Sequence, residues 1–121
     1  HAPHTDNEKE IEFDHAEFGA IGLETLLSVS VTELIVPGIL SWLELARLVS
    51  LNPAKILGVN KGNLNIGSPA DLTIISPEEE WVPSKEDFFS KSKNSPFLGR
   101  RLIGRVEATM HKGSILYFNK R

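Results

Sequence analysis

The sequence predicts an α/β fold, with helices in the first half of the chain and strands in the second. From Leu23 to Ile35 the apolar residues recur every three or four positions, which is the spacing of one buried helix face. From Val106 onward apolar and polar residues alternate, and Lys112 and Gly113 then turn the chain into a second alternating run, as in a β-hairpin. The chain therefore changes from a helical to a strand period along its length.

Local signals place the ends of three expected helices. Pro37 and Gly38 end the first, because proline cannot continue a helix and glycine favours its exit. The motif Ser-x-x-Glu at 41–44 predicts a capping box at the start of the second. A third, short helix is expected with Asn52 as its N-cap, Pro53 at its first position and Gly58 at its exit.

The other segments are assigned by the same rules. Residues 5–14 are polar and acidic, which favours an exposed loop. Leu64 and Ile66 alternate with asparagines, the period of a strand, and residues 72–75 form a β-branched run that Ser76 and Pro77 are expected to close.

Composition limits the classes of partner. The chain is 40% hydrophobic and 24% charged with a net charge of −3, so nothing in its charge favours nucleic acid. It has no cysteine, which excludes disulfides and fits a reducing cytoplasm. Glu33 and Glu44 interrupt the most apolar stretch, so no membrane span is expected. Because the chain starts at His1 without methionine, we expect it to be a piece of a larger protein.

Few polar residues stand out as candidates for chemistry. His4 near the start of the chain is either a ligand-binding residue or a solvent-exposed side chain, and Gly19 is either part of a binding turn or a mark of a helix start. His15 and His111 are interpreted as surface residues. Asp71, beside a predicted strand, more often pins a loop by hydrogen bonds than it performs catalysis.

Six motifs occur in a recognisable order. They are His-Ala-Pro-His at 1–4, Phe-Gly-x-x-Gly-Leu-Glu at 18–24, Asn-Pro-Ala-Lys at 52–55, Gly-Ser-Pro-Ala-Asp-Leu at 67–72, Ser-Lys-Ser-Lys-Asn-Ser-Pro-Phe at 90–97 and Gly-Arg-Val at 104–106. This series resembles the C-terminal part of the bacterial dihydroorotases of the longer type, in the amidohydrolase superfamily. The third and fourth motifs are common to many cyclic-amide hydrolases, whereas the first two are narrower.

The resemblance implies a fold in two parts. Residues 1–57 would be the C-terminal end of a TIM-like (β/α)₈ barrel of a metal-dependent hydrolase, comprising its last strand-to-helix loop and outer helices. Residues 58–121 would be part of a small, composite β-sandwich domain. A complete barrel takes roughly 250 residues, so the N-terminal remainder of the protein would supply most of it.

The resemblance also implies a reaction, the reversible zinc-dependent interconversion of L-dihydroorotate and N-carbamoyl-L-aspartate in pyrimidine biosynthesis. His4, Phe18 and Gly19 match the residues that bind the substrate. The catalytic aspartate is expected just before His1 and the zinc ligands further upstream, so this chain would hold neither a catalytic nor a metal-binding residue and would be inactive alone.

Two other interpretations stay open. The protein could be a noncatalytic dihydroorotase-like scaffold subunit that partners a carbamoyltransferase, because the ligands that would decide this lie upstream. It could also be a related hydantoinase or allantoinase. The assembly that the resemblance implies is a homodimer or a complex with a carbamoyltransferase.

Overall fold

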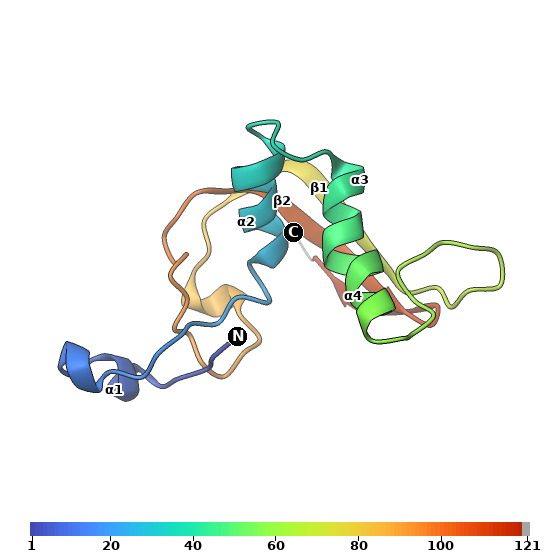
Figure 1. Cartoon of the computed structure of the whole chain (residues 1–121). Helices are drawn as coiled ribbons and strands as arrows, with labels where there is room; N and C mark the ends of the chain where they lie inside the picture. The colour runs from blue at the N-terminus through green and yellow to red at the C-terminus, as the bar shows by residue number, and fades with distance from the viewer. Residues whose placement is uncertain (120–121) are drawn as a thin grey trace.

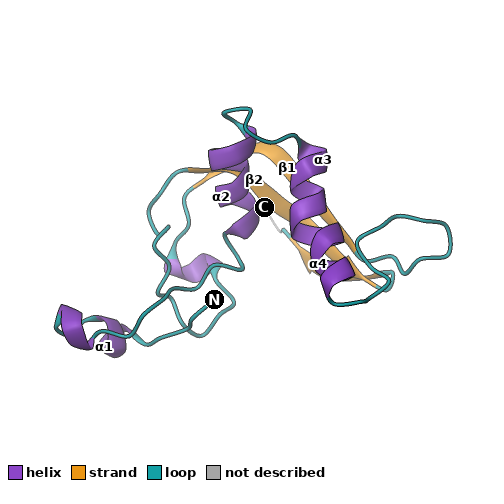
Figure 2. Cartoon of the chain, in the orientation of Figure 1, coloured by secondary structure: helices purple, strands orange, loops and turns teal. Residues whose placement is uncertain are grey.

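A computed structural model describes residues 1–119 as a three-stranded antiparallel sheet with helices on one face (Figures 1 and 2). The strands are β1 (Leu72–Trp81), β2 (Leu102–His111) and β3 (Ser114–Phe118), in the spatial order β1-β2-β3. β2 therefore lies in the centre, and β1 and β3 are the edges of this sheet. The predicted hairpin is confirmed, with Lys112 at φ 49° and Gly113 at φ 83° in the turn between β2 and β3.

The helical half contains two longer segments. In the first, α2 (Leu26–Ser30) continues into the π-helical turn η2 (Val31–Ile35). In the second, α3 (Trp42–Ala46), the π-helical turn η3 (Arg47–Leu51) and α4 (Asn52–Ile56) follow one another without interruption. Figure 1 shows both segments in front of the same face of the sheet.

The second segment confirms one predicted cap and corrects another. Ser41 and Glu44 form the capping box at the start of α3. Asn52 is not an N-cap, because its φ of −67° and ψ of −45° are helical and its N–H donates to the Arg47 carbonyl. In a regular α-helix the ring of Pro53 would clash with the carbonyl four residues back. Since the wider π turn of η3 precedes the proline, the helix continues where the sequence predicted a break.

Two predicted loop and strand assignments are also wrong. Within 5–14 the chain forms the short helix α1 (Asp6–Lys9), started by a capping box of Thr5 and Glu8, and the 3₁₀ turn η1 (Phe13–His15). Leu64 and Ile66 lie in a loop between α4 and β1 and are almost fully exposed. The reason is local: the Asn63 side-chain oxygen accepts hydrogen bonds within this loop, which competes with strand pairing.

β1 extends further than the sequence predicted. Ser76 and Pro77 do not end it, because the ladder resumes at Glu80, which pairs with Ile103 of β2. The register shifts between Ser76 and Glu80, so Pro77 lies in a bulge, where its missing N–H costs no ladder hydrogen bond. A further 3₁₀ turn, η4 (Lys85–Asp87), follows β1.

The core lies where α2 meets the sheet. Ser28 of α2 is buried; its hydroxyl donates to the Gly104 carbonyl of β2 at 2.5 Å and accepts from Trp81 Nε1 at 3.0 Å. Leu102 of β2 and Val31 of η2 are almost completely buried beside them. The helical and strand halves therefore share one core. Residues 1–119 contain one sheet, so the second sheet of the expected sandwich stays a prediction.

Candidate functional site

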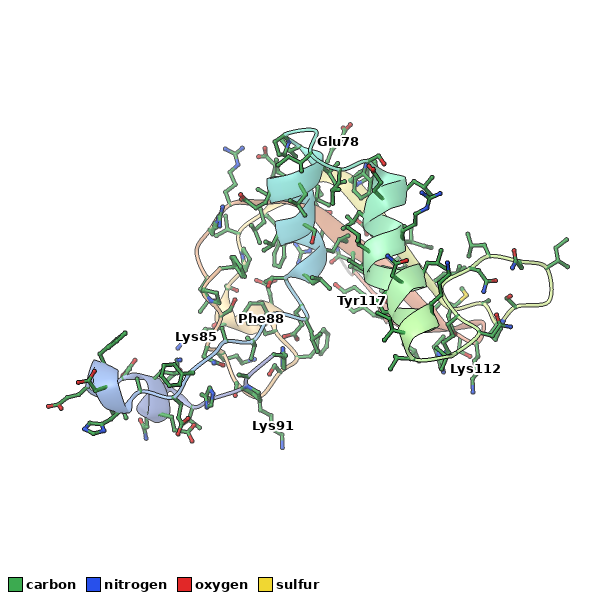
Figure 3. The ribbon with its side chains drawn as sticks, in the orientation of Figure 1. Glu78, Lys85, Phe88, Lys91, Lys112 and Tyr117 are labelled. Carbon is green, nitrogen blue, oxygen red and sulfur yellow. The ribbon has the colours of Figure 1, made fainter. Side chains whose placement is uncertain are left out.

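Three segments distant in sequence meet around the predicted substrate-binding residues. The N–H of Ala2 donates to the Ala20 carbonyl at 2.8 Å, and the N–H of Ile21 donates to the Asn94 carbonyl at 3.4 Å. The start of the chain, the segment before α2 and the loop before β2 therefore lie side by side. Figure 3 shows Phe88 and Lys91, at the beginning of that loop, on the same side of the molecule as the N-terminus in Figure 1.

The structure places His4 directly beside Phe18. His4 Nε2 lies 2.8 Å from the Phe18 carbonyl oxygen. A carbonyl oxygen only accepts, so Nε2 is the donor and carries the proton. The other ring nitrogen, Nδ1, is then without a proton in the neutral ring, and it becomes an N–H donor only when the ring is protonated.

The Phe18 and Gly19 backbone has the properties of a binding turn. Among residues 1–119, neither the Phe18 nor the Gly19 N–H donates a hydrogen bond, so both are free for a ligand. Gly19 has a φ of +92°, and a Cβ there would lie 2.6 Å from the Ala2 Cβ. Glycine is thus required both by its backbone conformation and by the close approach of the N-terminal segment.

One part of the predicted geometry is wrong. The resemblance implies that the Phe18 and Gly19 turn lies at the entrance of a helix, where the helix dipole favours an anion. The helix α2 begins only at Leu26, and residues 16–22 carry no helical structure. The helix predicted from Leu23 therefore starts too early in the sequence. Residues 23–25 form a turn, and Thr25, the residue before α2, has a φ of −108° and a ψ of −5°.

Sequence reasoning missed two residues that shape this region. Lys9 Nζ donates to the carbonyls of Glu17 at 2.5 Å and Gly19 at 3.0 Å, which places a cation behind the turn. Asn94 contacts residues 2–4 through its side chain. No motif or spacing in the polar stretch 5–14 distinguishes Lys9 as a functional residue. Asn94, in contrast, belongs to the motif at 90–97 on which the resemblance partly rests. An open cavity of about 390 Å³ borders Lys9, Gly19 and Asn94.

The remaining histidines are tied into the structure or lie on its surface. His1 Nδ1 accepts from the N–H of Gly22 at 3.0 Å and lies 3.4 Å from that of Leu23. His15 is exposed, as predicted. His111 is also exposed, and its Nδ1 lies 2.9 Å from an Asp71 oxygen.

Asp71 pins a loop, as predicted. It accepts hydrogen bonds from Lys61 Nζ at 2.5 Å and from the Lys112 N–H at 2.8 Å. The hydrogen bond from Lys61, followed by that from Lys112, lowers the pKa of the Asp71 carboxyl to about 2. Asp71 therefore joins the loop after α4 to the hairpin turn at Lys112. Figure 3 shows Lys112 far from Phe88 and Lys91.

Clustered metal-ligating side chains are absent from residues 1–119 of the structure. This part of the chain contains no group of three or more histidine, aspartate or glutamate side chains that could hold an ion. An apolar cavity of about 400 Å³ lies away from His4, between α2 and the sheet. It contains Arg105, which stacks 4.7 Å over the Trp81 ring and pairs with Asp87 at 3.3 Å.

In the part of the chain that is described, no helix is both long enough and apolar enough to span a membrane.

The fold and these motifs belong to a known class of hydrolases. The amidohydrolase family matches residues 4–116, and the chain belongs to this family. The chain is 48% identical over 115 residues to the dihydroorotase of Elusimicrobium minutum, covering 95% of this chain and 27% of that protein. It is 47% identical over its whole length to the dihydroorotase of Thermoanaerobacter sp., of which it covers 28%. The chain thus spans little more than a quarter of these relatives.

Solved structures show the same fold. The L-hydantoinase (dihydropyrimidinase) from Arthrobacter aurescens matches 88% of this chain with a TM-score of 0.82 and 34% identity, over 24% of its own length. The D-hydantoinase from Bacillus sp. AR9 matches 99% of this chain with a TM-score of 0.83 and 25% identity, over 28% of its length. Together with the family, these matches support the predicted TIM-barrel-type fold, of which this chain is a small α/β piece.

Proposed function

We propose that this chain is the C-terminal portion of a dihydroorotase, which interconverts L-dihydroorotate and N-carbamoyl-L-aspartate in pyrimidine biosynthesis. The observation that carries the proposal is the identity of 48% and 47% to two dihydroorotases over nearly the whole chain. The geometry of His4, Phe18 and Gly19 supports it, since the three residues that match the family's substrate-binding positions lie together.

In this proposal the role of the chain is to bind and orient the substrate carboxylate. Carboxylates accept hydrogen bonds, and the free N–H groups of Phe18 and Gly19 are donors that need no side-chain rearrangement. His4 Nε2 is already engaged with the Phe18 carbonyl, so the ring offers an N–H to an anion through a protonated Nδ1.

The bond-breaking chemistry belongs to the upstream part of the protein. We propose that an aspartate preceding His1 moves the proton and that ligands further upstream hold zinc. In such hydrolases the metal polarises the amide carbonyl and makes hydroxide available near neutral pH. Because the zinc ligands and the catalytic aspartate are proposed to lie upstream, this chain alone is proposed to be inactive.

The partner of this chain is proposed to be the N-terminal remainder of the same protein. Several large apolar side chains are more than two-thirds exposed, including Leu23, Leu57, Phe89 and Leu116. Leu23, Phe89 and Leu116 line the same cavity, and a contiguous apolar surface of this kind is common where another part of a fold packs. The division into a barrel part at 1–57 and a sandwich part at 58–121, a cytoplasmic location, and a homodimer or a carbamoyltransferase complex belong to this proposal.

The alternatives make different predictions. A hydantoinase is less well supported, because the L-hydantoinase match is 34% identical and the dihydroorotase matches are 48% and 47%. A noncatalytic scaffold subunit would keep the fold and lack the upstream catalytic groups. Aspartate immediately before His1 would support the enzyme, whereas alanine or asparagine there would support the scaffold.

The deciding experiment is turnover by the full-length protein. Purified protein loaded with zinc should consume L-dihydroorotate and N-carbamoyl-L-aspartate, with hydantoin and allantoin as competing substrates. Preferred turnover of hydantoin or allantoin would replace the proposal with the related activity. No turnover of any cyclic amide by the folded protein, after zinc has been supplied, would favour the scaffold.

A further inference from the structure

We propose that Asn94 is a positioning residue that clamps the His4 segment against the Phe18 and Gly19 turn. The inference rests on the proposed substrate-binding role of His4. Asn94 does not need to touch the substrate: it acts by fixing the backbone on either side of Pro3, and thereby the place of the His4 ring.

The contacts of Asn94 are made on both sides of one proline. Its side-chain Nδ2 donates to the Ala2 carbonyl at 2.9 Å, and its Oδ1 accepts from the His4 N–H at 3.3 Å. Pro3 lies between them and has no N–H of its own to offer. The side-chain amide of Asn94 therefore pairs with the backbone across Pro3 as the peptide group of a neighbouring strand would.

Asparagine is the side chain that this arrangement requires. The clamp needs a donor for a carbonyl and an acceptor for an N–H at the same branched end, and the amide of asparagine supplies both. Aspartate has the same size, but its second oxygen would face the Ala2 carbonyl oxygen. Alanine would leave the Ala2 carbonyl and the His4 N–H without these partners.

The loop that carries Asn94 is fixed to the other half of the site. The Asn94 carbonyl accepts from the Ile21 N–H at 3.4 Å. Earlier in the same loop, the N–H groups of Phe89 and Ser90 donate to Glu24 Oε1 at 2.5 Å and 3.1 Å. The loop is bound to residues 21–24 and its asparagine is bound to residues 2–4. Asn94 therefore fixes the position of the two candidate binding segments relative to each other.

This arrangement has a kinetic consequence. A residue that only positions His4 affects how well the substrate carboxylate is held and leaves the upstream chemistry alone. In the full-length protein, Asn94→Ala should raise KM for dihydroorotate by about 5- to 10-fold, the range for the loss of one or two neutral hydrogen bonds. The value of kcat should stay within about twofold.

Two variants control for size and for the loss of an asparagine. Asn94→Asp should behave like Asn94→Ala or worse, because it loses the donor to Ala2; wild-type kinetics for this variant would contradict the clamp. Asn63→Ala removes an asparagine that also makes two local hydrogen bonds, at 3.1 Å and 2.8 Å, in the distant loop before β1. It should leave KM unchanged.

A double-mutant cycle separates positioning from general destabilisation. In a His4→Ala background, Asn94→Ala should raise KM little further, because the ring that it positions is gone. If Asn94→Ala raised KM by the same factor with and without His4, the two residues would act independently and the proposal would be wrong.

Hydrogen exchange tests the clamp without any activity. Asn94→Ala should speed the exchange of the His4 N–H in the full-length protein, as measured by mass spectrometry on the peptide spanning residues 1–9. Unchanged exchange would overturn the clamp even in an active enzyme. Faster exchange in a protein that turns over neither dihydroorotate nor carbamoyl-aspartate would retain the clamp and refute the proposed function.

Discussion

Val31 of η2 packs directly onto the backbone of Gly104 in β2. A Cβ at Gly104 would lie 2.9 Å from Val31 Cγ2 and 3.1 Å from Val31 Cβ. One turn earlier, the Ser28 hydroxyl donates to the Gly104 carbonyl at 2.5 Å. The helical segment can approach the central strand this closely only because position 104 has no side chain.

Gly104→Ala should therefore destabilise the full-length protein by about 2–4 kcal/mol, the sum of overpacking and a strained backbone. Gly113→Ala is the matched control, because Gly113 has nearly the same φ, +83° against +85°, and nothing within 4 Å of the added Cβ. It should cost about 1 kcal/mol. Chemical denaturation measures both, and equal losses would show that the Val31 contact adds nothing.

Gly19→Val should raise KM for dihydroorotate by about tenfold or more with metal content unchanged, because the new side chain displaces Ala2 and the binding segment with it. The sequence alone suggests Gly62 as a neutral control, since it lies in a distant loop. The structure corrects this, because a Cβ at Gly62 would lie 3.0 Å from the backbone of Ser50. Gly67 is the better control: its φ is +88° and nothing lies within 4 Å.

The kinetic comparison is then between Gly19→Val and Gly67→Val in the full-length protein. Both variants place a β-branched residue at a positive φ, so the backbone strain is common to both. Because only Gly19→Val also displaces Ala2, only this variant should raise KM. A KM near the parent value for Gly19→Val would mean that the substrate is held elsewhere.

His4→Ala should weaken the binding of dihydroorotate and carbamoyl-aspartate by about 10- to 150-fold, because a hydrogen bond to a charged group contributes roughly 1.5–3 kcal/mol. Zinc content should not change, since His4 is not proposed as a ligand. Calorimetric binding and metal analysis test the two parts separately, with His15→Ala, at an exposed position, as the control. Loss of zinc together with activity would make His4 part of the metal site.

Asp71 should contribute pH-dependent stability. Its pKa in the folded chain, about 2, lies below the usual value of 3.8, chiefly because of the hydrogen bond from Lys61. A carboxyl whose pKa falls on folding stabilises the fold above its unfolded pKa, and this contribution is lost as the pH falls through the folded pKa. The stabilisation should thus be complete above about pH 4 and decline towards pH 2.

The comparison of Asp71→Asn with the parent protein measures this contribution. The parent should be more stable at neutral pH, and the difference should shrink between about pH 4 and pH 2. A difference that stayed constant with pH would assign the effect of Asp71 to its shape and not to its charge.

Some features of this chain follow from the sequence because they depend on neighbouring residues. The capping box of Ser41 and Glu44 needs only residues three apart, and the turn at Lys112 and Gly113 needs only two residues that tolerate a positive φ. The order of the motifs likewise identified the family that the comparisons show. These are short-range or purely sequential properties, so the sequence alone determines them.

The tertiary structure decided the rest. Whether Asn52 caps a helix or continues one depended on a π turn ahead of Pro53. Asn94 and His4 are 90 positions apart, and no periodicity in the sequence reports a contact between two irregular segments. Their meeting depends on how α2 and the loop before β2 pack around a common core, because irregular backbone takes its conformation from the hydrogen-bond partners that the fold brings to it.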